Sequence, residues 1–150
     1  MALTAKEKSL LKDLKKQSTL SGEKYECYTE CAGDKQLIEL CKKIGECKTK
    51  THELIMKMDK GEQPTVPKCN PKKPTFKAAY STTASAEKKH DAFICNDLLS
   101  NEKYLAGLYN TCIFEFTTDE NRAVLNYILT ETQRHGKLLY DYMSTNHMMS

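Results

Sequence analysis

Apolar residues recur in the second half of the chain at alternating intervals of three and four, which places their side chains on one face of an α-helix. One stripe, about six turns long, consists of Cys95, Leu98, Glu102, Leu105, Tyr109, Cys112 and Phe116. The next consists of Val124, Ile128, Glu131, His135, Leu138 and Tyr142. Between them, Thr118 or Asp119 can cap the start of the second helix. No stretch shows the period-two alternation of a β-strand.

The first half of the chain carries two weaker stripes of the same kind. Its opening helix is predicted from Leu10, Leu14, Leu20 and Cys27. Its second helix is predicted from Leu37, Leu40, Ile44, Cys47, Thr51, Leu54 and Met58. The segment AGD at residues 32–34 predicts the turn between these helices. The whole chain is therefore expected to be α-helical.

A short repeat relates the two halves. The pentapeptide SGEKY at residues 21–25 returns as SNEKY at residues 100–104, 79 positions later. A histidine follows on the next predicted helix of each half, His52 after Tyr25 and His135 after Tyr104. The second of these separations is longer by four positions, which corresponds to about one helical turn. We therefore expect two related helical hairpins, whose pentapeptides are related by a pseudo-two-fold axis.

A proline-rich segment separates the halves. Residues 61–89 hold all four prolines and are too polar for a core element. We expect a single domain over residues 1–150, with hairpin one at about 3–60, a crossover link at about 61–89 and hairpin two at about 90–145. One long link between the second and third helices is the ferritin-like arrangement. The alternative, two hairpins on a flexible tether, leaves each apolar stripe without a partner. The pattern favours an antiparallel four-helix bundle.

Composition narrows the classes of function. The chain has 23 basic and 20 acidic residues, and only Arg122 and Arg134 are arginines. Nucleic-acid recognition favours arginine and a one-sided basic patch, so this class is not expected. No run approaches the ~18 apolar residues of a membrane span. The first residues, MALTAKEKSLL, lack the apolar core of a signal peptide, so we expect synthesis in a cytoplasm without export by that route.

Residues 96–143 resemble the CotF-like spore coat family of endospore-forming bacteria. The resemblance rests on a leucine pair, then EKY, then Tyr-Asn-Thr, and then the closing segment NYILTETQRHGKLLYDYM. It is weaker over residues 3–61, where it runs through the internal repeat. The resemblance implies a ferritin-like bundle with a structural role, made in the mother-cell cytoplasm and deposited in the spore coat. It also implies other coat proteins and further copies of the chain as partners.

The ferritin-like arrangement raises an alternative function, a metalloprotein that handles iron or peroxide. Di-iron bundles take one glutamate from each of two helices and a Glu-x-x-His motif from each of the other two. Here Thr49 and Thr132 stand three residues before the two matched histidines, so both carboxylates of that motif are missing. In the structural interpretation the same polar groups pair with each other inside the bundle, with no cofactor. The candidate ligands for iron or manganese are Glu23, His52, Glu102, Glu131 and His135.

Seven cysteines are the remaining unusual feature. They form no CxxC and no zinc-binding spacing, and no motif places a nucleophile beside a histidine, so no enzyme is expected. Cys95 and Cys112 fit the role of small buried residues. Cys69 lies in VPKCNPKK, where flanking prolines favour exposure and nearby lysines should lower the pKa of its thiol. We expect disulfide cross-links between chains led by Cys69, with Cys31 and Cys41 next; the alternative is an exposed thiol without a role.

Overall fold

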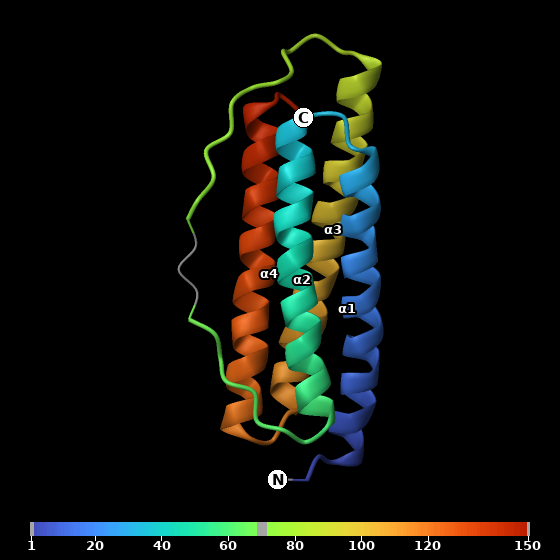
Figure 1. Cartoon of the computed structure of the whole chain (residues 1–150). Coiled ribbons are helices and arrows are strands. Elements are labelled where there is room, and N and C mark those ends of the chain that lie inside the picture. Colours follow the sequence, from blue (N-terminus) through green and yellow to red (C-terminus); the bar gives the residue numbers. More distant parts are fainter. Residues whose placement is uncertain (1, 69–71, 150) are drawn as a thin grey trace.

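The structure is a computed structural model that describes residues 2–68 and 72–149. Within these residues it contains no strand and four helices: α1 (Ala5–Cys31), α2 (Lys35–Asp59), α3 (Ala86–Glu115) and α4 (Asp119–Thr145). Helix α1 packs along α2 and α3 along α4, while α1 also contacts α3 and α2 contacts α4. Neighbouring helices are antiparallel, and the crossover link returns the chain along the length of the bundle (Figure 1). The predicted all-α bundle of two hairpins is confirmed.

Side-chain caps fix where the helices begin. Thr4 and Glu7 form a reciprocal capping box at the start of α1. Thr118, one of the two caps predicted for α4, accepts a hydrogen bond from the backbone N–H of Asn121. Helix α3 begins at Ala86 because Ser85 caps it, four residues before the start expected from the apolar stripe. The crossover link therefore spans residues 60–85.

The buried face of α1 differs from the predicted one. Leu20 and Cys27 are exposed, and the face that packs inward consists of Glu7, Leu11, Leu14, Ser18, Ser21 and Tyr25. This face alternates intervals of four and three, as a helix requires, but two of its members are serines. Of the predicted residues Leu14 is buried and Leu10 half-buried, so a search for apolar residues alone leaves the buried face only in the second half of the helix. In α3, by contrast, every residue of the predicted stripe is buried.

The interior consists of two apolar clusters, one toward each end of the bundle. The first contains Leu11, Leu14, Leu54, Ile55, Met58, Leu105, Tyr109, Cys112, Phe116, Val124, Leu125 and Ile128. The second contains Tyr25, Ala32, Leu37, Leu40, Cys41, Ile44, Ile94, Cys95, Leu98, Leu139, Tyr142 and Met143. Polar residues separate the two clusters at mid-height: Ser18, Ser21, Lys48, Thr51, Glu102, Glu131, Thr132 and His135. We call this set the polar layer.

The two hairpins are related by a constant shift in residue number. Helix α1 ends at Cys31 and α3 at Glu115, 84 positions later, and α2 begins at Lys35 and α4 at Asp119, again 84 positions later. We call this relation the hairpin shift. Under it each of the six buried residues of α1 has a buried counterpart in α3, and seven of the nine buried residues of α2 have one in α4. The shift exchanges the two apolar clusters, so the pseudo-two-fold axis passes through the polar layer.

The predicted equivalence of the two EKY pentapeptides is therefore wrong in register. Their separation falls short of the hairpin shift by five positions, and five residues turn a helix by about 140°. In hairpin one Tyr25 is buried and Glu23 exposed, whereas in hairpin two Glu102 is buried and Tyr104 exposed. The halves are related as expected, but not by the residues that first suggested the relation.

Two reciprocal contacts join the hairpins at their turns. Asp91, at the start of α3, accepts hydrogen bonds from the backbone N–H groups of Gly33 and Asp34, both at 2.8 Å. Glu7, at the start of α1, accepts from the backbone N–H of Thr117 at 2.9 Å. Glu7 and Asp91 are equivalent under the hairpin shift, and so are Gly33 and Thr117. Each hairpin thus holds the turn of the other, which a pair of tethered hairpins would not do.

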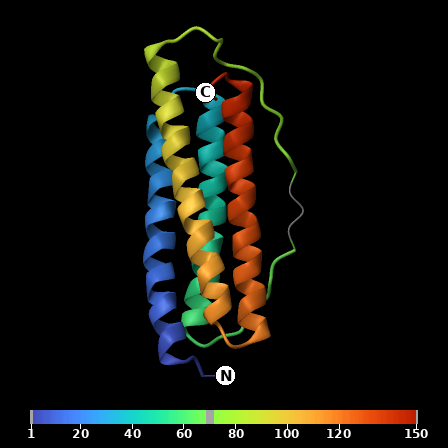
Figure 2. The same cartoon turned by 180° about the vertical axis from the view of Figure 1, so that it is seen from behind.

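The crossover link is attached to the bundle along the α2–α4 side (Figures 1 and 2). Pro67 lies in a groove with Leu54 and Tyr127, and the ring of Phe76 meets that of Tyr142 edge-on, 5.5 Å between centroids. Further along, the Tyr80 hydroxyl donates to Asp91 at 2.6 Å. These attachments leave the outer side of α3 uncovered by the described part of the link.

Candidate functional site

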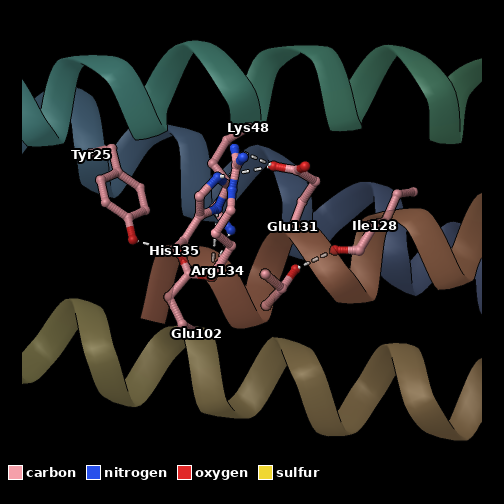
Figure 3. A network of polar contacts seen from close by, with 8 residues as sticks. Tyr25, Lys48, Glu102, Ile128, Glu131, Arg134 and His135 are labelled. Atoms are coloured by element: carbon pink, nitrogen blue, oxygen red, sulfur yellow. Dashed lines mark hydrogen bonds and ion pairs between the residues drawn. The ribbon is translucent and has the colours of Figure 1, made fainter. Parts of the chain in front are cut away.

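A buried ion pair forms the centre of the polar layer (Figure 3). The Lys48 ammonium on α2 donates to Glu102 Oε2 on α3 at 2.7 Å, and both side chains are almost fully buried. The Tyr25 hydroxyl on α1 donates to the other oxygen, Glu102 Oε1, at 2.5 Å. The Lys48 ammonium also lies 5.9 Å from the centroid of the Tyr25 ring. Side chains from two helices, α1 and α2, thereby donate to one carboxylate on a third, α3.

Helix α4 contributes an imidazole that is close to these charges without being hydrogen-bonded to them. His135 Nδ1 lies 4.0 Å from Glu102 Oε2, and His135 Nε2 lies 3.8 Å from Glu131 Oε2. Within the described residues neither ring nitrogen has a hydrogen-bond partner. Glu131 accepts instead from Arg134 Nη2 at 2.8 Å. Burial, followed by the positive charges of Lys48 and Arg134, lowers the pKa of His135 well below its usual value, so the imidazole is neutral near pH 7.

Burial also controls the protonation of the other members of the layer. It raises the pKa of Glu102, while Lys48 and Tyr25 act in the opposite direction by stabilising the carboxylate. Burial and the neighbouring Glu102 raise the pKa of Tyr25 well above its usual value, so its hydroxyl stays protonated as a donor. The carboxylates of Glu102 and Glu131 thus accept from donors within the bundle, namely Tyr25, Lys48 and Arg134. The arrangement is chemically a buried, internally neutralised pair with one additional neutral imidazole.

The five predicted metal ligands do not gather in one place. Glu102, Glu131 and His135 lie in the polar layer, as expected. Glu23 is exposed, and half-buried His52 lies on the α1–α2 side, where its Nδ1 is 2.8 Å from Ser18 Oγ. The prediction that Glu23 joins the layer is therefore wrong, and His52 touches the layer only at its edge, through Ser18. Among residues 2–68 and 72–149 no group of three or more acidic, histidine or cysteine side chains is arranged to hold a metal ion.

The hairpin shift explains why the donor set does not fit a di-metal centre. A di-iron bundle needs a glutamate on the first helix of each hairpin and Glu-x-x-His on the second. The buried positions here carry Ser18 and Lys48-x-x-Thr51 in hairpin one, and Glu102 and Thr132-x-x-His135 in hairpin two. Only two of the six positions hold a suitable ligand. Lys48 moreover brings a positive charge to a place where the metal centre would need a carboxylate.

Lys48 is the member of the layer that sequence reasoning missed. Aligning His52 with His135 pairs Lys48 with Glu131, and in that pairing the lysine counts only as a missing ligand. Its position four residues after Ile44 and three before Thr51 would have placed it on the buried stripe. A lysine on such a stripe requires a buried acidic partner. That requirement points to Glu102, which was already predicted to face inward.

The described cysteines range from exposed to buried, with Cys47 half-buried between the two. Cys27 and Cys31 are exposed near the end of α1, whereas Cys41, Cys95 and Cys112 are buried. Desolvation, followed by the neighbouring Cys27, raises the pKa of the Cys31 thiol. Burial raises the pKa of Cys41 to about 12, and this thiol is out of reach of another chain in the folded protein. Cys69 lies outside the described residues.

The fold defines the class of protein as an all-α bundle of two antiparallel hairpins with one long crossover. Residues 90–150, which include all of α4 and most of α3, match the family model of the Coat F domain. Most of hairpin two is thus similar to the Coat F domain, and this match supports the resemblance of the chain to the CotF-like spore coat family. The Coat F domain indicates a component of the spore coat.

The other comparisons add no relative. No curated protein matches the chain, and no solved structure matches it. Kinship with ferritin-like proteins therefore stays a prediction that rests on the connectivity of the helices. No helix in the described part of the chain combines the length and apolar character needed to cross a membrane.

Proposed function

We propose that the protein is a structural, non-enzymatic component of the bacterial endospore coat that packs into the shell with other coat proteins and with itself. The observation that carries this proposal is the Coat F match over residues 90–150. The interior supports it, because its ionisable groups stabilise the bundle: Glu102 accepts from Lys48 and Tyr25, and Glu131 accepts from Arg134. The chain is made in the mother-cell cytoplasm and is deposited on the developing spore.

Within the coat the chain becomes cross-linked through disulfides. Cys69 leads this reaction because of its proline-flanked, lysine-rich sequence, and Cys31 follows because it is exposed at the end of α1. Each cross-link joins two thiols, which lose two protons and two electrons to dioxygen or a peroxide. These oxidants become available when the mother cell lyses, whereas thiols in a cytoplasm stay reduced.

Fractionation of spores tests the location. An epitope-tagged chain should appear in the coat fraction, and its recovery in the spore core instead would refute the coat function. Non-reducing gels of the same extract test the cross-links. Cys69→Ser should remove most disulfide-linked dimers and Cys31→Ser fewer, whereas the buried-site control Cys112→Ala should leave them unchanged. If the unmodified protein formed no disulfide-linked dimers, the proposed cross-linking would be refuted, whereas the proposed location in the coat would still stand.

A further inference from the structure

The outward side of α3 carries three large aromatic side chains that the described bundle leaves more than half exposed. Phe93, Tyr104 and Phe114 are 66%, 55% and 74% exposed. Their spacing along the helix places all three within about 80° of one another around its axis. Figure 2 shows α3 (yellow to orange) toward the viewer, with the link running along α4. The rings lie about 15–17 Å apart along the helix, so they form a row and not one continuous patch. Single exposed apolar residues are normal on a protein surface, and what distinguishes these three is that they lie on one side of one helix.

Small residues on the same side would let a neighbouring helix approach closely. Gly107 lies in the middle of α3, and a Cβ added there would meet nothing within 4 Å. Glycine in a helix interior is less favourable than alanine, and no contact within the bundle calls for it. Ser100 stands two turns away on the same side, on the opposite flank of Tyr104. The face thus has small residues near its centre and a phenylalanine toward each end.

The sequence of this face is self-complementary when it is paired with an antiparallel copy of itself. Phe93 precedes Tyr104 and Phe114 follows it, at separations that differ by only one position. A two-fold axis near Tyr104 therefore brings Phe93 of one copy to Phe114 of the other, and Ser100 to Gly107. The ends carry opposite charges, since exposed Lys89 lies at one end and half-exposed Glu115 at the other.

We propose that this outer face of α3 is a homodimer interface, in which two copies pack α3 against α3 in antiparallel orientation about a two-fold axis near Tyr104. The same face then contacts itself, as in most symmetric dimers. Lys89 of each copy lies within reach of Glu115 of the other, because their levels differ by about three residues, roughly 4.5 Å along the helix. In the dimer, Glu115 gives up its surface ion pair with Lys6, 2.5 Å long, and pairs with Lys89 of the other copy instead.

The area of the face sets the strength of the dimer. Thirty helical residues extend over about 45 Å, and a strip about 10 Å wide along them buries roughly 450 Å² on each copy. Stable dimers bury about 800 Å² on each partner, so this one is weak and reversible in dilute solution. It forms where the chain is concentrated, as in a shell. The interface goes beyond the proposed coat function, because its argument uses only the surface of α3.

Sedimentation equilibrium of the reduced protein tests the interface. The average mass should rise from 17.1 kDa toward twice that value between about 10 µM and 1 mM, the range expected for a small interface. Phe114→Glu should raise the dissociation constant at least tenfold, while Tyr140→Glu, at an exposed aromatic on α4, should not change it. A protein that stays monomeric throughout, or an equal effect of Tyr140→Glu, would overturn the proposal.

A charge exchange tests the antiparallel arrangement. Lys89→Glu and Glu115→Lys should each weaken self-association, because each creates two like-charge contacts in the dimer. An equimolar mixture of these two variants should form heterodimers with both contacts restored, and the double variant should dimerise like the unmodified protein. Circular dichroism checks that every variant stays helical. Failure of both the mixture and the double variant to recover would rule out the antiparallel pairing.

Discussion

Replacing Lys48 by methionine removes the cation of the polar layer and keeps most of the side-chain volume. Glu102, which is 2% exposed, then retains the Tyr25 hydroxyl as its hydrogen-bond donor. Removing one partner of a buried ion pair costs about 3–5 kcal/mol. For a chain of this length that loss lowers the melting temperature by roughly 6–20 °C. We expect the loss to be largest near pH 8, where Glu102 would have to stay charged.

The loss should shrink as the pH falls. Burial already raises the pKa of Glu102, and without the opposing effect of Lys48 it rises further. A carboxyl whose folded pKa is raised favours the folded state below its unfolded pKa of about 4.3, and this contribution is lost as the pH rises through the folded value. The deficit of Lys48→Met should therefore grow from pH 4 to pH 8, by at most about 1.4 kcal/mol per pH unit.

Urea unfolding followed by circular dichroism over that pH range measures the effect. The control is Lys15→Met, which removes a partly exposed pair with Asp59 and should cost less than about 1 kcal/mol. Adding Glu102→Gln to Lys48→Met should recover most of the loss, because the side chain that has lost its cation is then uncharged. A deficit below about 1 kcal/mol at pH 8, the worth of a surface pair, or one independent of pH, would refute the buried-pair reasoning.

Three further changes test other parts of the structure. The depressed pKa of His135 makes the fold lose stability as the pH falls below about 6.5. His135→Gln should reduce the slope of this loss by up to about 1.4 kcal/mol per pH unit, measured by urea titrations at several pH values. An unchanged slope would contradict the buried neutral imidazole. Asp91→Asn should cost about 1–3 kcal/mol and speed hydrogen exchange at Gly33, whereas unchanged exchange would mean that the turn holds without the carboxylate. Gly107→Ala should stabilise the monomer by about 0.5–1 kcal/mol and weaken its self-association in sedimentation; tighter association would contradict the close helix approach.

Hairpin two could be predicted from the sequence almost completely, because its buried face consists mostly of apolar residues. The predicted stripes of α3 and α4 are buried apart from Leu138, which is half-buried while its neighbour Leu139 takes the core position. Glu102 and His135 were correctly placed inside, since each stands between apolar residues at helical spacing. Here periodicity and hydrophobicity agree, and either alone gives the right face.

Hairpin one was harder because these two signals disagree. Its interior includes Ser18, Ser21 and Lys48, while Leu20 faces solvent. Ranking residues by hydrophobicity therefore misplaces the second half of the α1 stripe. Glu23 and His52 became candidate ligands for a different reason, the match of the two pentapeptides and of the two histidines. The match of the two pentapeptides gave the wrong register, because similar residues in two helices do not have to lie on the same side of each helix. The burial pattern, compared between halves, gives the register directly.

The constant hairpin shift is what duplication and fusion of a single hairpin would leave behind. The ancestor would have been a chain half this length that paired with a copy of itself, each turn held by the acid of the other chain, as Glu7 and Asp91 do today. In that dimer the mid-plane had to carry identical residues from both chains. Joining the copies freed the two sides to diverge, so the pair of Lys48 with Glu102 now occurs once, while the equivalent positions carry Thr132 and Ser18. The crossover link would be the later addition. The two hairpins, made as separate chains, should therefore still associate into the bundle.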